Sequence, residues 1–262
     1  MKRILHTGKI ADIGDYLKLT ACTAVMLQPI LNLALRTMPE ATTQMVIGAV
    51  YNLVKFTAPA FIFGILYTTM RTTVDTAVTY QQYLKQSWHS LFVPTLWWTS
   101  IYLLAMPWVQ QVRHYHSWKS FVWQFINGNA APHLWYNTMM LQFILLMPLF
   151  WLIGRWCQTV PKRGWFIVAL TLIITGLWLE FYDREVFHGP HMADWYLTDR
   201  LFISFLIYGI LGTLAWQYRK AVNPWLQKWW GAILLICIAS FYWICRELFA
   251  FGYPVKLTNA PY

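Results

Sequence analysis

The feature that most constrains this chain is an apolar stretch from His133 to Leu152, which carries no formal charge after its first residue. About twenty apolar residues in a helix are enough to cross a bilayer core of ~30 Å. Seven such runs occur along the chain: Leu17–Leu35, Gln44–Met70, Leu91–Trp108, Leu134–Gly154, Trp165–Phe181, Leu201–Gln217 and Trp230–Leu248. Continuous runs are typical of membrane helices, since barrel strands are short and alternate. We therefore predict an all-α integral membrane protein, a polytopic helix bundle with about seven transmembrane helices.

Composition agrees with this fold class. Only 11% of the 262 residues are charged, against about 25% in soluble domains. The chain also has 17 Trp and 15 Tyr, which suit a protein with many rings at the membrane interface. The four cysteines have no zinc-type or disulfide-framework spacing.

The distribution of the net charge of +10 predicts an orientation. With a cytoplasmic N-terminus, the inner segments hold twelve of the Lys and Arg residues: Lys2, Arg3, Lys9, Lys18, Arg71, Lys85, Arg155, Lys162, Arg163, Arg219, Lys220 and Lys228. The outer segments hold seven: Arg36, Arg113, Lys119, Arg184, Arg200, Arg246 and Lys256. This bias obeys the positive-inside rule. The basic charge thus follows from topology, and we expect no nucleic-acid partner.

His133 is the first candidate for chemistry, because it opens the apolar stretch after a lead-in of Asn127, Gly128, Asn129 and Pro132. A histidine there can act as a general base, since its pKa lies near neutrality. It can equally be a plain N-terminal helix residue bonded to its own turn.

Lys55 is the second candidate. If one helix starts at Gln44, Lys55 lies near the middle of the bilayer, where a cation is costly. If Gln44–Val54 is an interfacial helix, Lys55 lies at the outer edge, and we favour this interpretation. A lysine beside Pro59 could bind an anion or a carbonyl, or it could be an interface anchor.

Other polar residues allow two interpretations each. Gln28 could position a substrate or simply bond a neighbouring helix, and Lys18 could be an anchor that snorkels to the interface. His188 and His191 flank Gly189-Pro190, which breaks the helix that would align both rings, so we expect no metal site. The outer loops mix carboxylates with rings, which suits a glycan or a generic aromatic belt: Glu180, Tyr182, Asp183, Glu185, Asp194, Trp195, Tyr196 and Asp199.

Four segments resemble the acyltransferase-3 family of membrane acyltransferases. DYLKLTACTAVMLQPIL, from Asp15, resembles its first helix, and VKFTAPAFIFGILY, from Val54, its second. YLKQSWHSLFVPTLWW, from Tyr83, resembles the start of its third helix, and GNAAPHLWYNTMMLQFILLMPLF, from Gly128, its HLW-type helix. The likeness is nearest to the branch of the intercellular-adhesion (poly-N-acetylglucosamine) polysaccharide O-acyltransferases.

The resemblance implies a bundle of about ten helices that transfers an acyl group from a cytoplasmic acyl-CoA-type donor to an envelope glycan. We therefore expect residues 1–262 to be one acyltransferase-3-like domain, incomplete at its C-terminus. The sequence departs from the family at its catalytic base: Gln28-Pro29 stands where the first-helix histidine is usual. Lys18 and Lys55 replace arginines, and only Lys85 and His89 remain of the basic residues at the third helix.

The favoured interpretation is a multi-pass enzyme of the bacterial plasma membrane that acylates a hydroxyl of an envelope polysaccharide or glycolipid. His133 would be the base, Lys55 the charge stabiliser, and Gln28 would position the substrate. Candidate substrate-binding residues are Lys18, Arg71, Trp135, Glu180 and Asp183. No cofactor beyond the donor co-substrate is expected. Two alternatives stay open: a non-catalytic partner or glycan-export component with the same fold, and a small transporter.

Overall fold

The computed structural model describes residues 13–37, 40–74, 78–110, 114–192 and 194–250. Every regular element in these ranges is a helix, which confirms the predicted all-α class. The chain divides into two compact units, one formed by Met1–Thr68 with Tyr218–Ala260 and the other by Thr69–Gln217. Each unit is described by itself below. The predicted C-terminal segment after Leu248 lies outside the residues whose side chains are described.

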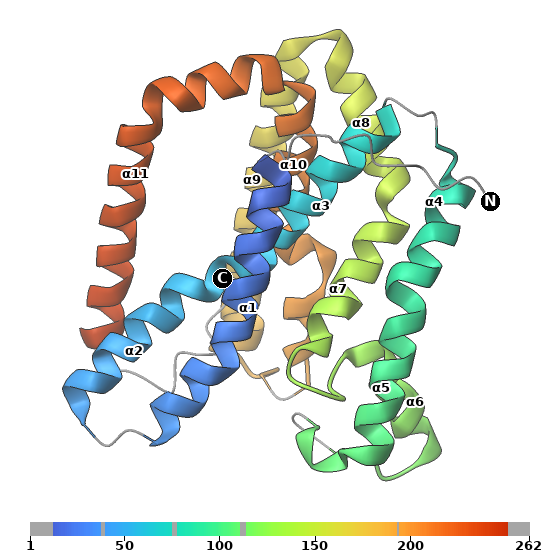
Figure 1. Ribbon diagram of the computed structural model, residues 1–262, viewed down its shortest axis with the longest axis vertical. Helices are drawn as coiled ribbons and strands as arrows, with labels where there is room; N and C mark the ends of the chain where they lie inside the picture. The colour runs from blue at the N-terminus through green and yellow to red at the C-terminus, as the bar shows by residue number, and fades with distance from the viewer. Residues whose placement is uncertain (1–12, 38–39, 75–77, 111–113, 193, 251–262) are drawn as a thin grey trace. The chain divides into compact units, whose positions relative to one another are not determined.

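The first unit is built around α1. Its helices are α1 (Ile13–Thr37), α2 (Ala41–Leu53), the short 3₁₀ turn η1 (Val54–Phe56), the first part of α3 (Thr57–Val74) and α11 (Arg219–Ala250). The helix α1 packs along α2 and η1, and α11 contacts α2 (Figure 1). The turn η1 separates α2 from α3 at the position where the sequence predicted a boundary.

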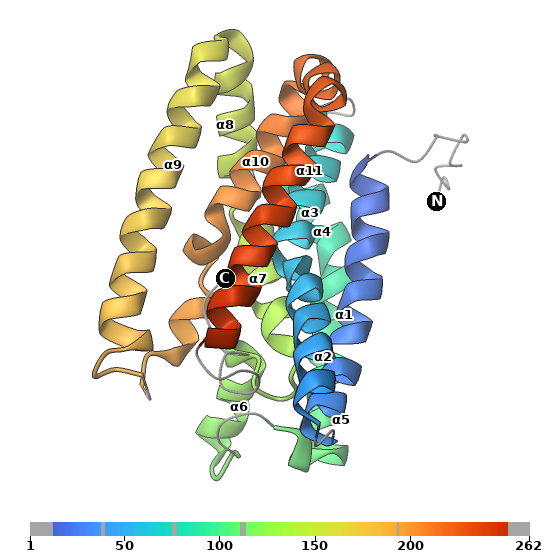
Figure 2. The ribbon, with the colours of Figure 1, turned by 90° about the vertical axis from the view of Figure 1, so that its left-hand side faces the viewer.

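The second unit holds the remaining elements. They are α4 (Tyr80–Ser87), η2 (Trp88–Phe92), α5 (Val93–Ala105), η3 (Pro107–Val109), α6 (Trp118–Asn127), α7 (Leu134–Leu145), α8 (Met147–Thr159), α9 (Pro161–Tyr182), η4 (Asp183–Phe187), η5 (Tyr196–Arg200), η6 (Phe202–Phe205) and α10 (Leu206–Gln217). The helices α8, α9 and α10 lie side by side (Figure 2). The connections between α6 and α7 and between α9 and α10 carry most of the polar side chains considered below.

The core of the second unit is tightly packed between α7, α8 and α10. Phe143 and Phe150 are fully buried and stack with their ring centroids 5.7 Å apart. Gly209 lies against both rings, since a Cβ there would be 2.9 Å from Phe143 and 3.1 Å from Phe150. Close packing of this kind leaves no room for an added methyl group. A glycine therefore allows α10 to approach α7 and α8.

Four described helical segments are long and apolar enough to cross a membrane: Gly14–Leu35, Thr42–Thr73, Pro161–Phe187 and Arg219–Glu247. A fifth is possible if the bent pair α7 and α8 forms one span. Phe202–Gln217 is a shorter apolar helix, and the predicted run Leu91–Trp108 folds as parts of η2, α5 and η3. The count of seven and the cytoplasmic N-terminus stay predictions.

The predicted helix over Leu134–Gly154 is broken. The helices α7 and α8 meet at Leu146 and are bent by 53°. Pro148 lies in the first turn of α8, where it has no backbone N–H to donate to the preceding turn. The proline therefore ends α7 and begins a new helix. A count of apolar residues does not predict this break, because proline is itself an apolar residue.

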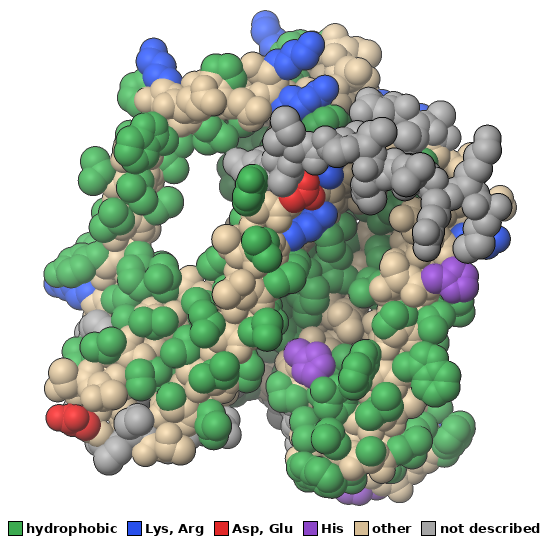
Figure 3. Space-filling model, in the orientation of Figure 1, with side chains coloured by type: hydrophobic (Ala, Val, Ile, Leu, Met, Phe, Trp, Pro, Cys, Tyr) green, Lys and Arg blue, Asp and Glu red, His purple; other side chains and the backbone are tan. Residues whose placement is uncertain are grey.

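The surface is largely hydrophobic. Exposed apolar side chains run along α1, α9 and α11, for example Leu33, Ile173 and Leu235. Figure 3 shows hydrophobic side chains covering much of the visible surface of these units. Apolar patches of this extent are unusual on soluble monomers, and they suit helices that face lipid.

Candidate functional site

The predicted base, His133, lies at the N-terminus of α7 in the second unit, directly after the loop that follows α6. Gly128 ends α6 with φ +71°, a left-handed conformation that favours glycine. A Cβ at this glycine would lie 2.6 Å from the Cα of Trp135. The loop can therefore fold back closely onto the first turn of α7, which places His133 at the mouth of the helix.

The surroundings of His133 favour its neutral form. Its ring packs against the edge of the Tyr102 ring, with centroids 5.2 Å apart, while the residue keeps an exposed surface. Partial burial lowers the pKa of His133 below its ordinary value by desolvation. At neutral pH the imidazole is therefore unprotonated and can accept a proton. Within the described residues, no ion pair or hydrogen bond fixes the orientation of the His133 ring.

A buried polar network lies beside the same loop, and its centre is Arg200 at the end of η5. The guanidinium donates hydrogen bonds to the carbonyl of Asn127 and to Oδ1 of Asn129, the latter at 2.7 Å. Asn129 in turn donates from Nδ2 to the hydroxyl of Tyr196 at 2.8 Å. Arg200, Asn127 and Asn129 are all less than a tenth exposed. The network thus joins the loop before α7 to the connection before α10.

Gln142 of α7 binds the backbone at Arg200 and at Phe202. Its Nε2 donates to the carbonyl of Arg200 at 2.8 Å, and its Oε1 accepts from the N–H of Phe202 at 3.0 Å. Both backbone groups would otherwise need other partners inside the protein. The amide therefore holds the chain on either side of Leu201 against α7.

Charge in this network is only partly compensated. Asp199 Oδ1 lies 3.8 Å from Arg200 Nε, a distance at which attraction is present but no good hydrogen bond forms. Burial raises the pKa of the Asp199 carboxyl to about 6, and the Arg200 charge partly opposes that rise. Burial lowers the pKa of Arg200, although a guanidinium stays charged at neutral pH. The result is a cation held mainly by neutral oxygens.

Sequence reasoning missed Arg200, Asn129 and Gln142 as a group. The sequence shows the Asn127-Gly128-Asn129 lead-in, but it gives Arg200 only as one of the predicted outer cations. The partners lie 58 to 73 residues apart in the chain. No local spacing could have paired them.

The predicted substrate-binding residues of the second unit lie on different elements. Trp135 is half-buried, and its ring lies near the rings of Phe205 and Tyr136. Arg71 is half-buried near the end of α3. Glu180 is exposed at the end of α9, and exposed Asp183 begins η4. Their roles in binding stay predictions.

The two histidines of the HxxH pattern have different partners. His188 Nδ1 lies 2.8 Å from Asp183 Oδ1, and His191 stacks on Trp195 with centroids 4.0 Å apart. The helical turn η4 ends at Phe187, before the Gly189-Pro190 step. Among the described residues, no group of three His, Cys, Asp or Glu side chains lies close enough to hold a metal.

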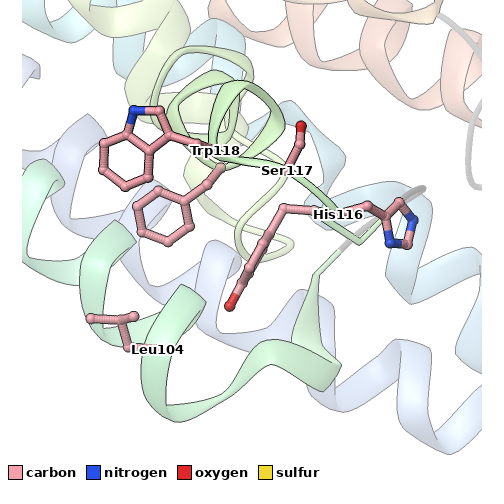
Figure 4. A pocket seen from close by; sticks show the side chains of 6 residues that line it. Leu104, His116, Ser117 and Trp118 are labelled. Atoms are coloured by element: carbon pink, nitrogen blue, oxygen red, sulfur yellow. The ribbon is translucent and has the colours of Figure 1, made fainter.

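An open aromatic hollow lies at the connection between α5 and α6. Leu104, Tyr115, Ser117, Trp118 and Phe121 line it together with His116. Figure 4 shows Trp118 and Leu104 on one side and His116 pointing away from them. Trp118 stacks on Phe121 with centroids 5.4 Å apart. The lining surface is mainly apolar, so it suits an apolar or ring-shaped neighbour better than a reacting centre.

In the first unit, Lys55 lies in η1, the turn between α2 and α3, and the side chain of Gln28 of α1 contacts the same turn. Gln28 Nε2 donates to the carbonyl of Val54 at 2.8 Å and to Oγ1 of Thr57 at 3.1 Å. The ammonium of Lys55 lies 5.5 Å from the ring centroid of Tyr51, within cation–π range. Gln28 thus bonds a neighbouring helix, as one of its two interpretations predicted.

Lys18 lies nearer the N-terminus of α1, and its side chain packs over Gly64 of α3. A Cβ at Gly64 would be 3.3 Å from Lys18 Cγ, so the absent side chain makes room for the lysine stem. His133 belongs to the other unit, and the joint catalytic role predicted for it and Lys55 stays a prediction.

These observations can be compared with known proteins. A family model described as an acyltransferase domain, that of acyltransferase family 3, matches residues 15–259. The chain belongs to the acyltransferase-3 family. No match was found among the curated proteins or the solved structures that were compared. The matched range includes all four segments on which the resemblance rested. Together with the apolar helices, the acyltransferase-3 domain supports a membrane acyltransferase in general terms.

Proposed function

We propose that this acyltransferase-3 protein is a membrane O-acyltransferase. It moves an acyl group from a cytoplasmic acyl-CoA-type donor to a hydroxyl of a cell-envelope polysaccharide or glycolipid. The observation that carries this proposal is the family match over residues 15–259. The nearest resemblance, to the poly-N-acetylglucosamine branch, makes a bacterial envelope glycan the proposed acceptor and the plasma membrane the proposed location.

His133 is the proposed general base. Its neutral imidazole, exposed at the mouth of α7, takes the proton of the acceptor hydroxyl as the oxygen bonds to the thioester carbonyl carbon. The carbon–sulfur bond then breaks, and the departing thiolate recovers the proton from His133. The products are a glycan ester and a free thiol, so that protons and bonds balance.

The other predicted residues have supporting roles in this scheme. Lys55 would stabilise the oxyanion, and a cation at that point lowers the barrier by favouring developing charge. Gln28 would contribute by holding the α2–α3 turn that carries Lys55, which is the contact the first unit shows. Lys18 and Arg71 would bind the anionic donor, while Trp135, Glu180 and Asp183 would bind the acceptor.

A second function is a catalytically degenerate partner or glycan-export component. The observation that favours it is Gln28, which stands at the family's histidine position and uses its amide nitrogen to bind Val54 and Thr57. A glutamine cannot accept the hydroxyl proton. If His133 does not replace the missing base, the protein binds glycan without acylating it.

The proposal is tested by measuring acyl esters on the envelope glycan of cells that express the protein. Mild alkali releases the esterified acid, which can be measured per cell. We expect esters with the wild type and a rate at least about 100-fold lower with His133→Ala, the range for loss of a general base. His116→Ala, a histidine outside the proposed site, should behave as the wild type.

The same assay separates the two functions. Unchanged acylation by His133→Ala removes this residue from the mechanism. No acylation by the wild type, together with acylation by Gln28→His, identifies a degenerate enzyme.

A further inference from the structure

The first eleven residues of α11, Arg219–Trp229, form a segment that we call the basic arm. The candidate span Arg219–Glu247 has 29 residues, which corresponds to about 44 Å of helix. A bilayer core is only ~30 Å thick, so about nine residues exceed it. The predicted apolar run begins at Trp230. The excess length and the start of the apolar run together indicate that the basic arm is the part of α11 outside the core of the membrane.

The basic arm is amphipathic. At 100° per residue, Val222, Trp225 and Trp229 fall on one side of the helix. The opposite side carries Lys220, Asn223 and Gln227, while Arg219 and Lys228 lie at the two borders between the sides. The tryptophans are well exposed, Trp225 by 55% and Trp229 by 46%. No described protein surface covers this apolar side fully.

The helix bends after its first turns, as Figure 1 shows, so that the basic arm runs in a different direction from the rest of α11. Pro224 lies inside α11, and a proline within a helix is a common cause of such a bend. The basic arm carries the cations Arg219, Lys220 and Lys228. The bend allows the apolar part to cross the bilayer while the basic arm lies along its surface.

We propose that the basic arm binds the headgroups of anionic phospholipids at the membrane surface. Its apolar side would rest among the upper acyl chains, where tryptophans are favoured. Its cations would meet the lipid phosphates, and Lys228 also lies 5.7 Å from the Trp229 ring.

Charge complementarity selects an anionic lipid over a zwitterionic one. The sequence has no Asp or Glu between Asp199 and Glu247, so the basic arm itself carries no carboxylate. Each cation near an anionic surface strengthens binding by roughly fivefold. A free phosphate would satisfy the cations but would leave the tryptophan side without a partner, which favours a lipid.

Lipid retention by the full-length protein tests this inference. The protein is reconstituted in vesicles of equal phosphatidylglycerol and phosphatidylcholine and extracted in detergent, and the lipids that remain bound are counted by mass spectrometry. The test variant is Lys220→Gln/Lys228→Gln. The matched control, Lys119→Gln/Arg246→Gln, removes the same charge elsewhere, including a cation 5.7 Å from the Trp243 ring on the same helix.

We expect the wild type and the control to retain phosphatidylglycerol preferentially. The test variant should lose that preference by about 25-fold, from two lysines at roughly fivefold each, and Lys220→Arg/Lys228→Arg should restore it. An equal loss in the control overturns the proposal, as does an unchanged preference in the test variant. Displacement of the lipid by millimolar inorganic phosphate or coenzyme A also overturns it, because the basic arm would then be a site for free phosphates or for the donor.

Discussion

Arg200 shows how a single buried cation can organise the loops of the second unit. Its guanidinium is shared between two asparagines, and its carbonyl is bound by Gln142. An arginine suits this place because its planar group donates several hydrogen bonds in fixed directions. We infer that the network positions the loop that carries His133, because Asn127 and Asn129 lie just before it.

Arg200→Leu should lower the thermal midpoint of the purified protein. The change leaves the buried oxygens of Asn127 and Asn129 without their donor, at a cost of about 1.5–3 kcal/mol for hydrogen bonds to a charged group. In a chain of this size that corresponds to several degrees. Arg184→Leu is the control, since that side chain is 79% exposed. Equal midpoints for the two variants would contradict the role of the network.

Asp199 gives a pH dependence of stability. Its folded pKa of about 6 lies above the ordinary value of 3.8 for an aspartate, so the native state binds the proton more tightly than the unfolded chain does. The stability from this group is complete below pH 3.8 and is lost as the pH rises through 6. Asp199→Asn removes that loss.

The thermal midpoint of Asp199→Asn relative to the wild type should therefore rise between pH 4 and pH 7. Half of the Asp199 side chain is exposed, so solvent screening limits the gain to about 1 kcal/mol or less. A difference between the two proteins that is constant across this range would contradict the raised pKa.

Among the elements, the loop between α6 and α7 depends most on one residue. Gly128→Ala puts a side chain at φ +71° and 2.6 Å from the Cα of Trp135, so both backbone strain and steric overlap oppose it. We expect a loss of at least about 2 kcal/mol in thermal unfolding. Gly176→Ala in α9 is the control, because nothing lies within 4 Å of its added Cβ. A similar midpoint for both variants would show that the loop can relax.

The sequence predicts the long helices well, and the physical reason is their composition. The runs Leu17–Leu35 and Trp165–Phe181 lie inside α1 and α9, since a continuous apolar segment in lipid has to be helical. The bend at Leu146 was not predicted, because a proline can be tolerated inside a membrane helix or can end it, depending on the packing around it. The π-helical turns η2 and η4 likewise leave no pattern in the residue types.

At the scale of the whole molecule, the sequence predicts the class of protein and its family. It predicts only some of the residues of the candidate site. His133 is a candidate because it stands directly before an apolar helix, and Gln28 because it interrupts one; their roles stay predictions. Arg200 could not be found, because its partners come together only after the loops around α7 and α10 have folded. The roles of Lys55 and His133 as joint catalytic residues stay a prediction.

Acyl transfer in proteoliposomes tests the central claim most directly. The full-length protein is mixed with acetyl-coenzyme A and poly-N-acetylglucosamine fragments, and free thiol and alkali-labile ester are measured together. Our account predicts one thiol for each ester with the wild type, and both reduced at least about 100-fold by His133→Ala. Absence of both products with the wild type, or equal rates with His133→Ala, would contradict it.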